Sequence, residues 1–151
     1  MNSMTSESEL LSCFREIDRD DVELTADLQF PLAVDEVVAW ASGPRAFLVF
    51  RERPGSRARG IVFHRNSGTA PDMAAMCEWC HAVRGHGGVK LMSVRVDERK
   101  RVGLYLCSDV SCISRAHETP SPDDVPDRAD GGERARRTLK RIAEFASRRL
   151  F

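Results

Sequence analysis

Four of the five cysteines in this chain form two close pairs, and paired thiolates are strong ligands for zinc. Two residues separate Cys77 from Cys80, and four separate Cys107 from Cys112. Each pair can place two sulfurs on one ion, and the chain between the pairs is long enough to fold back as a hairpin. The spacing therefore predicts a Zn²⁺ site whose ligands are Cys77, Cys80, Cys107 and Cys112.

Such a zinc ion would be structural, because four protein sulfurs leave no coordination position for a catalytic water. The remaining cysteine, Cys13, is interpreted as a small apolar residue on a helix face. The sequence shows no serine-hydrolase signature, no phosphate-binding glycine loop followed by lysine, and no pair of carboxylates in an apolar setting. We therefore expect a protein that is not an enzyme and has no small-molecule substrate.

The same residues allow three other interpretations. Residues 77–81 also match the attachment motif of c-type haem, although that chemistry is extracytoplasmic and leaves the second cysteine pair unexplained. A redox-active dithiol needs a strand ahead of the first pair, and residues 71–76 do not have a strand pattern. In the third interpretation, His81 or His86 replaces Cys112 as the fourth ligand.

Composition and charge limit the setting and the partners. The net charge is zero, no stretch reaches the apolar length of a membrane span, and residues 1–11 lack an export signal. We expect a cytoplasmic protein that does not bind membranes, in a compartment where clustered thiols stay reduced. The charges are locally uneven, since Glu52 is the only acid between residues 45 and 65, where arginines dominate. Such asymmetry can attract a partner despite the neutral total.

Apolar runs predict two antiparallel hairpins within one domain of 151 residues. Their expected strands are residues 46–50, 60–64, 89–96 and 102–106. The tip of the second hairpin is a charged turn at residues 97–101.

Helical spacing predicts an N-terminal helix over residues 6–17, with a capping box at Ser6 and Glu9, and a basic amphipathic helix over 133–150. A further short helix is expected around Val37–Ala41, ending at Gly43-Pro44. Residues 119–132 are acidic and proline-rich and predict a flexible linker.

A knuckle, a hairpin and a short helix that begins at Cys112 and continues to about His117 follow the order of a treble-clef zinc finger, with its core at residues 74–117. The predicted fold is α+β: this finger is joined to an antiparallel β-hairpin and flanked by N- and C-terminal helices.

The motif region also resembles a known family. Its residues are Met76-Cys77-x-x-Cys80, then Gly87-Gly88-Val89-x-Leu91-Met92, then Gly103-x-Tyr105-x-Cys107-x-Asp109-x-x-Cys112. This run is similar to the FBP-type treble-clef zinc-finger domain, which is the C-terminal part of the FusB-type fusidic-acid-resistance proteins. The resemblance implies the same four zinc ligands and a protein that binds elongation factor G and modulates its release from the ribosome, with fusidic-acid tolerance as a possible consequence.

The partner surface is predicted from exposed residue types. Trp79 lies between two ligands, where a small knuckle cannot easily bury an indole, and Arg99, Lys100 and Arg101 occupy the hairpin tip. An aromatic side chain flanked by arginines suits a protein hot spot. The alternative for Trp79 is a core residue that covers the zinc site. The alternative function is a structural zinc module that binds ribosomal RNA through its arginines.

Overall fold

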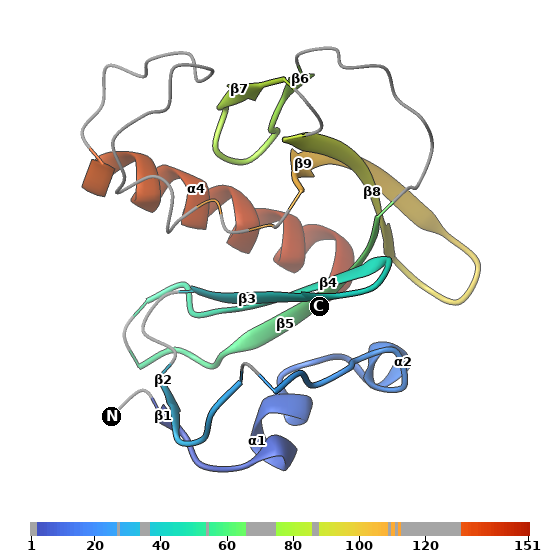
Figure 1. Cartoon of the computed structure of the whole chain (residues 1–151), viewed down its shortest axis with the longest axis vertical. Coiled ribbons are helices and arrows are strands. Elements are labelled where there is room, and N and C mark those ends of the chain that lie inside the picture. Colours follow the sequence, from blue (N-terminus) through green and yellow to red (C-terminus); the bar gives the residue numbers. More distant parts are fainter. Residues whose placement is uncertain are drawn as a thin grey trace.

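The computed structural model describes residues 3–26, 28–33, 37–53, 55–65, 75–85, 88–108, 110, 112 and 131–151. A five-stranded sheet with neighbouring strands antiparallel occupies the centre (Figure 1). In spatial order, its strands are β3 (Val37–Ser42), β4 (Arg45–Phe50), β5 (Arg59–Arg65), β8 (Val89–Arg95) and β9 (Arg101–Cys107). Both predicted hairpins, β4–β5 and β8–β9, are confirmed by the strand pairing.

The short helix expected around Val37–Ala41 is wrong, because these residues form strand β3. Gly43 and Pro44 connect β3 to β4, and Ser42 pairs with Arg45 across this two-residue turn. Gly43 has φ of +58°, a backbone conformation that glycine adopts without steric cost. The pairing with β4 therefore decides the structure of a segment whose own pattern favours a helix.

Alternating side chains of the central strands build a separate core on each face of the sheet. Along β4, Phe47 and Val49 enter one core, while Leu48 and Phe50 enter the other. Both faces are covered, and this explains why β4 is apolar along almost its whole length.

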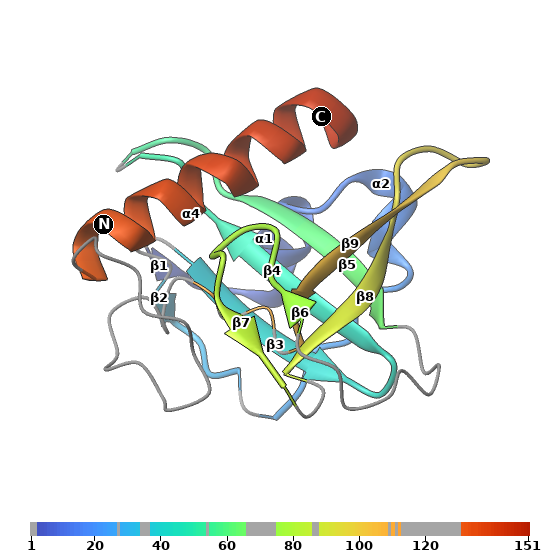
Figure 2. The ribbon, with the colours of Figure 1, turned by 90° about the horizontal axis from the view of Figure 1, so that it is seen from above.

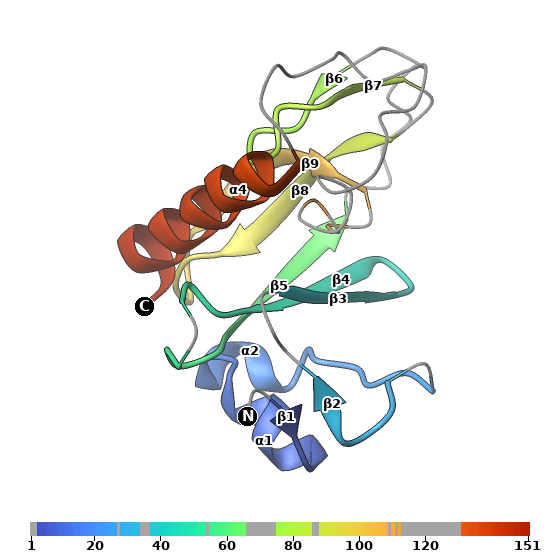
Figure 3. The same ribbon diagram turned by 90° about the vertical axis from the view of Figure 1, so that its left-hand side faces the viewer.

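The N-terminal layer covers the first face (Figure 3). It consists of strand β1 (Ser3–Met4), helix α1 (Glu7–Ser12), helix α2 (Glu16–Arg19) and strand β2 (Leu32–Ala33), which pairs with β1. Half of the predicted capping box is confirmed, since Ser6 Oγ accepts a hydrogen bond from the Glu9 amide at 3.3 Å, whereas the Glu9 carboxylate accepts from the amide and the hydroxyl of Thr5. The helix is shorter than expected, because Phe14 leaves it to form an isolated parallel bridge with Gly60 of β5.

Helix α4 (Gly131–Phe145) lies across the opposite face of the sheet and is continued by the π-helical turn η1 (Ala146–Leu150) (Figure 2). It buries a row of apolar side chains at helical spacing: Ala135, Leu139, Ile142, Ala143 and Ala146. These elements confirm the predicted C-terminal helix. Beside them lies a further two-stranded sheet of β6 (Ala75–Met76) and β7 (Val83–Arg84).

Two expectations concern residues outside the described ranges, namely the short helix after Cys112 and most of the linker at 119–132. Among the described residues, no helix is long and apolar enough to cross a membrane.

Candidate metal centre

The first cysteine pair lies in a tight turn between β6 and β7. The Cys77 amide donates to the Ala82 carbonyl, and the His81 amide donates to the Cys77 carbonyl, both at 2.9 Å. The Cys80 amide donates to Cys77 Sγ at 3.5 Å. His81 takes a positive φ of 62°, which lets the chain reverse direction immediately after Cys80. This turn is the knuckle expected from the two-residue spacing.

The second pair is positioned by the end of β9, where Cys107 is the last residue of the strand. The Val110 amide donates to the Cys107 carbonyl at 2.9 Å, which turns the chain toward Cys112. Glu78 connects the two pairs: its amide donates to the Tyr105 carbonyl at 2.8 Å, and its Oε2 accepts from the Tyr105 amide at 2.6 Å. The knuckle is thereby attached to the outer edge of β9.

These elements bring the four predicted sulfurs together, all within 4.8 Å of one another. Sγ of Cys77 lies 3.6 Å from that of Cys112, and Sγ of Cys80 lies 3.5 Å from that of Cys107. A tetrahedron with Zn–S bonds of about 2.3 Å has edges of about 3.8 Å, whereas a disulfide bond is about 2.05 Å long. The donor set and its dimensions therefore fit Zn²⁺, and all four cysteines are free of disulfides.

Without a metal ion, the electrostatics of the cluster favour two thiolates and two thiols. Hydrogen bonds from the Cys107 side chain first, and from Cys112 next, lower the pKa of Cys77 far below that of an ordinary thiol. The same two partners lower the pKa of Cys80. Hydrogen bonding with Cys107 first, and with Cys77 next, raises the pKa of Cys112. The pKa of Cys107 is also raised, because the influence of Cys112, which lowers it, is outweighed by those of Cys77 and Cys80. Zinc requires deprotonated sulfur, so binding of the metal must release the protons of this second pair.

Trp79 covers the cluster and is only 4% exposed, so the expectation that it lies on a partner surface is wrong. Its indole packs against Phe63 of β5 at 5.6 Å and against Phe145 of α4 at 5.8 Å between ring centroids. Arg141 of α4 donates a hydrogen bond to the Trp79 carbonyl. A helix distant in sequence thus supplies the cover that the knuckle itself lacks.

His81 does not replace Cys112 as the fourth ligand, because Cys112 belongs to the sulfur cluster and His81 is exposed. His86 lies outside the described residues. The haem and dithiol interpretations involve only the first cysteine pair, whereas the structure brings the sulfurs of both pairs together.

The hairpin tip matches its prediction, since Arg99, Lys100 and Arg101 are exposed. Asp97 Oδ1 accepts hydrogen bonds from the Arg99 and Lys100 amides, at 2.8 and 2.9 Å, and so shapes the turn. The predicted partner surface lacks one exposed pair on the same hairpin, Leu91 and Tyr105. Strand alternation could have found it, because Met92 and Leu104 are the neighbours that face inward.

Comparison with protein families gives one result that covers most of the chain. The model of a family described as FBP C-terminal treble-clef zinc-finger matches residues 8–148. No curated protein and no solved structure matches. The match confirms the suspected family, and together with the four-sulfur cluster it makes this centre a zinc site.

Proposed function

This chain belongs to the FBP C-terminal treble-clef zinc-finger family, and from that premise we propose that it binds elongation factor G and modulates its release from the ribosome. Fusidic-acid tolerance would follow where faster release frees the drug-stalled factor. The observation that carries the proposal is a closed zinc centre at the base of an exposed hairpin.

The zinc centre is closed because four sulfurs fill the tetrahedron and three of them, those of Cys77, Cys107 and Cys112, belong to buried residues. Zinc held in this way contributes to folding and offers no coordination position to a substrate. It joins the knuckle to the end of β9 and so fixes the hairpin that β9 forms with β8. A binding role therefore suits this centre better than a catalytic one.

The β8–β9 hairpin extends beyond the rest of the sheet (Figures 1 and 2). Leu91 and Tyr105 face each other across its two strands and are 36% and 49% exposed. Arg101 shares their face by strand alternation. We define the hairpin surface as Leu91, Arg99, Lys100, Arg101 and Tyr105. An exposed aromatic ring together with arginines is the composition of a protein hot spot, and Tyr105 replaces Trp79 as the aromatic residue of the proposed surface.

Affinity of the zinc-loaded protein for purified elongation factor G tests the proposal. Tyr105→Ala and the triple reversal Arg99→Glu, Lys100→Glu and Arg101→Glu should each weaken binding by about ten-fold or more. The matched control reverses three charges on α4, at Arg136, Arg137 and Lys140, and should leave the affinity unchanged. Unchanged affinity in both hairpin variants would reject the surface, and absence of binding by the unaltered protein would reject the function.

One observation favours the alternative, a ribosomal RNA partner. Helix α4 and η1 present a set of exposed cations: Arg136, Arg137, Lys140, Arg148 and Arg149. Phosphate contacts from such side chains release counterions, so RNA affinity would fall steeply as salt rises. If the α4 triple reversal abolishes a salt-dependent association with ribosomes while the hairpin variants retain it, the RNA function replaces the protein one.

A further inference from the structure

The tip end of the β8–β9 hairpin has little support from the main sheet. Ser93 is the last residue of β8 that pairs with β5, and beyond it β8 and β9 pair only with each other among the strands that the structure describes. Val94 and Leu104 are buried in the core that includes α4, which supports the hairpin from one side. A two-stranded hairpin is marginally stable by itself, so the orientation of the tip depends on its other contacts.

A guanidinium group from the N-terminal layer makes such a contact. Arg15, the N-cap residue of α2, donates through Nη1 to the Val96 carbonyl at 2.7 Å and through Nη2 to the Arg95 carbonyl. Its Nε donates to Asp18 Oδ2 at 2.9 Å. The rigid fork of the guanidinium group therefore holds two consecutive carbonyls of the hairpin, while the carboxylate fixes the fork.

The contact is reciprocal and shielded from water. Arg95 Nη1 donates to the Ile17 carbonyl at 3.5 Å, and Arg95 Nη2 lies 3.9 Å from Asp21 Oδ2. The side chains of Arg15 and Asp18 are only 11% and 4% exposed, so salt and solvent screen their ion pair much less than a surface pair. We define the α2 clamp as Arg15, Asp18 and Arg95.

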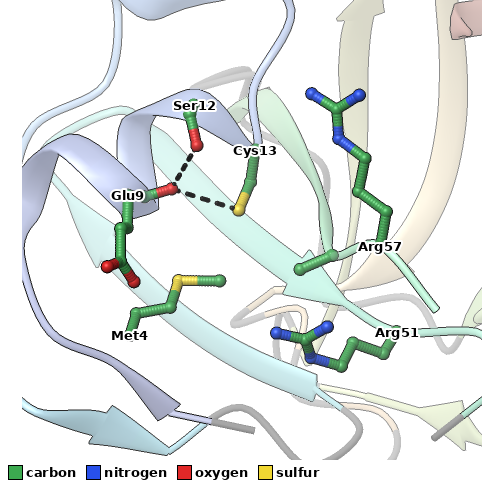
Figure 4. Close-up of a pocket in the computed structure, with 7 residues that line it drawn as sticks. Met4, Glu9, Ser12, Cys13, Arg51 and Arg57 are labelled. Carbon is green, nitrogen blue, oxygen red and sulfur yellow. Dashed lines mark hydrogen bonds between the residues drawn. The ribbon is translucent and has the colours of Figure 1, made fainter. Parts of the chain in front are cut away.

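The chain just before Arg15 is fixed to the central sheet. At the end of α1, Cys13 Sγ donates to the Glu9 carbonyl at 3.5 Å (Figure 4). The Gly60 amide of β5 donates to the Cys13 carbonyl at 2.9 Å, and Phe14 forms its bridge with the same glycine. The clamp therefore connects a fixed point on β5 to the tip end of the hairpin.

We propose that Arg15 is a positioning residue for elongation factor G binding, and that the α2 clamp holds the hairpin tip in the orientation in which its cations meet the factor. This role rests on the proposed function and deepens it, because Arg15 lies outside the hairpin surface. The clamp acts close to the cations, since the Val96 amide donates to the Lys100 carbonyl at 2.8 Å. A tip that is ordered before association avoids the entropy cost of ordering it on the partner.

The test uses a clamp variant that leaves no unpaired buried charge. Arg15→Gln combined with Asp18→Asn removes the fork and its carboxylate together, whereas Arg15→Gln alone would leave the Asp18 carboxylate uncompensated. Arg15→Lys is the second variant, because it keeps the charge beside Asp18 but has no fork. The matched control is Arg19→Gln, since Arg19 Nε donates to the Phe14 carbonyl at 3.2 Å, away from the hairpin. Zinc content and the free energy of unfolding show that each protein is folded.

Hydrogen exchange reports on the clamp without the factor. The Val96 amide should exchange about five-fold faster in the clamp variant, because hydrogen bonds that limit local opening of the tip are lost. Its exchange should stay unchanged in Arg19→Gln. Protection at residues 104–107, next to the zinc centre, should also stay unchanged.

Affinity for purified elongation factor G tests the role in binding. The clamp variant should bind about five-fold more weakly, and Arg19→Gln should bind as tightly as the unaltered protein. On the background of the triple reversal Arg99→Glu, Lys100→Glu and Arg101→Glu, the clamp change should cause no further loss, because it acts through those cations. A merely structural role would give the same further loss on both backgrounds.

The proposal is overturned by unchanged exchange at Val96, by full affinity of a folded, zinc-loaded clamp variant, or by an equal further loss on the triple-reversal background. Absence of binding by the unaltered protein would reject the proposed function, and the positioning role with it. Binding by the unaltered protein that the clamp variant retains in full would reject the positioning role alone.

Discussion

The two faces of the central sheet are held together in different ways. On the face of the N-terminal layer, Trp40 stacks on Phe47 with ring centroids 5.3 Å apart and meets Phe14 edge-on at 6.2 Å. The Trp40 indole donates to the Glu23 carbonyl at 2.8 Å, so its polar group is satisfied. Aromatic packing of this kind needs no metal.

On the opposite face, the zinc centre connects pieces that are too short to be stable by themselves. Strands β6 and β7 have two residues each, and β8 pairs with β5 through only two residue pairs, His64 with Ser93 and Arg65 with Met92. Four sulfurs and the cover of Trp79 hold this region. We therefore expect the order of the lobe formed by β6, β7, β8 and β9 to depend on the metal, although α4 also packs on this face through Leu139, Ile142 and Ala143, whereas the core on the other face is built by packing alone.

The two regions also contact each other, so neither is completely isolated from the other. Arg15, paired with Asp18 at 2.9 Å, donates to the Val96 carbonyl at the end of the hairpin at 2.7 Å. This contact ties the N-terminal layer to the tip end of the β8–β9 hairpin, where the Val96 amide donates to the Lys100 carbonyl.

The largest effect should come from Cys107→Ser, which removes one ligand at the end of β9. Structural zinc contributes about 10 kcal/mol or more of binding free energy in small zinc fingers, so we expect loss of stoichiometric zinc and of amide-exchange protection in β8 and β9. The N-terminal layer should keep its protection. Elemental analysis and hydrogen exchange measure both, and Cys13→Ala, which alters the cysteine outside the cluster, should retain zinc. Full zinc content in Cys107→Ser would contradict the ligand assignment.

A smaller effect, confined to the other face, is expected from Gly60→Ala. The added Cβ would lie 2.6 Å from the ring of Phe14, so the packing of Phe14 against β5 must shift. We expect a loss of about 1–3 kcal/mol in the free energy of unfolding, measured by urea denaturation, with zinc content unchanged. Gly85→Ala is the control, because no atom lies within 4 Å of its added Cβ. Equal losses in the two variants would show that the close contact with Phe14 does not matter.

The smallest effect is a pH dependence at the junction of the two regions, where His64 of β5 pairs with β8. Burial, and next the charge of Arg101, lower the pKa of His64 below its usual value of 6.5. The unfolded chain then binds more protons than the folded chain between the lowered pKa and 6.5, so stability falls as the pH drops through this window. Urea titrations at pH 7.5 and about pH 5.5 should show a smaller loss in His64→Gln than in the unaltered protein. An equal loss of stability in both proteins would show that His64 does not cause the pH dependence.

Local spacing was enough to predict the four ligands, because the geometry of a cysteine knuckle is set within a few residues. The same holds for strands β4, β5, β8 and β9, whose apolar runs are long and bounded by turns. Strand β3 was not predicted, because its identity depends on pairing with β4 rather than on its own pattern. For Trp79, spacing alone leaves a partner surface and a core position both open, and the core position is the one confirmed. The choice depends on helix α4, which lies about 60 residues away in the chain.

The two tryptophans provide the most direct test of the central claim, since Trp40 lies in the aromatic core and Trp79 over the zinc cluster. Two single-tryptophan proteins, Trp79→Phe and Trp40→Phe, would be treated with a zinc chelator while fluorescence is recorded. We predict that the emission of Trp79 shifts to longer wavelength as zinc is removed and that the emission of Trp40 stays in place. A simultaneous shift of both, or of neither, would contradict a metal-dependent lobe on a metal-independent core.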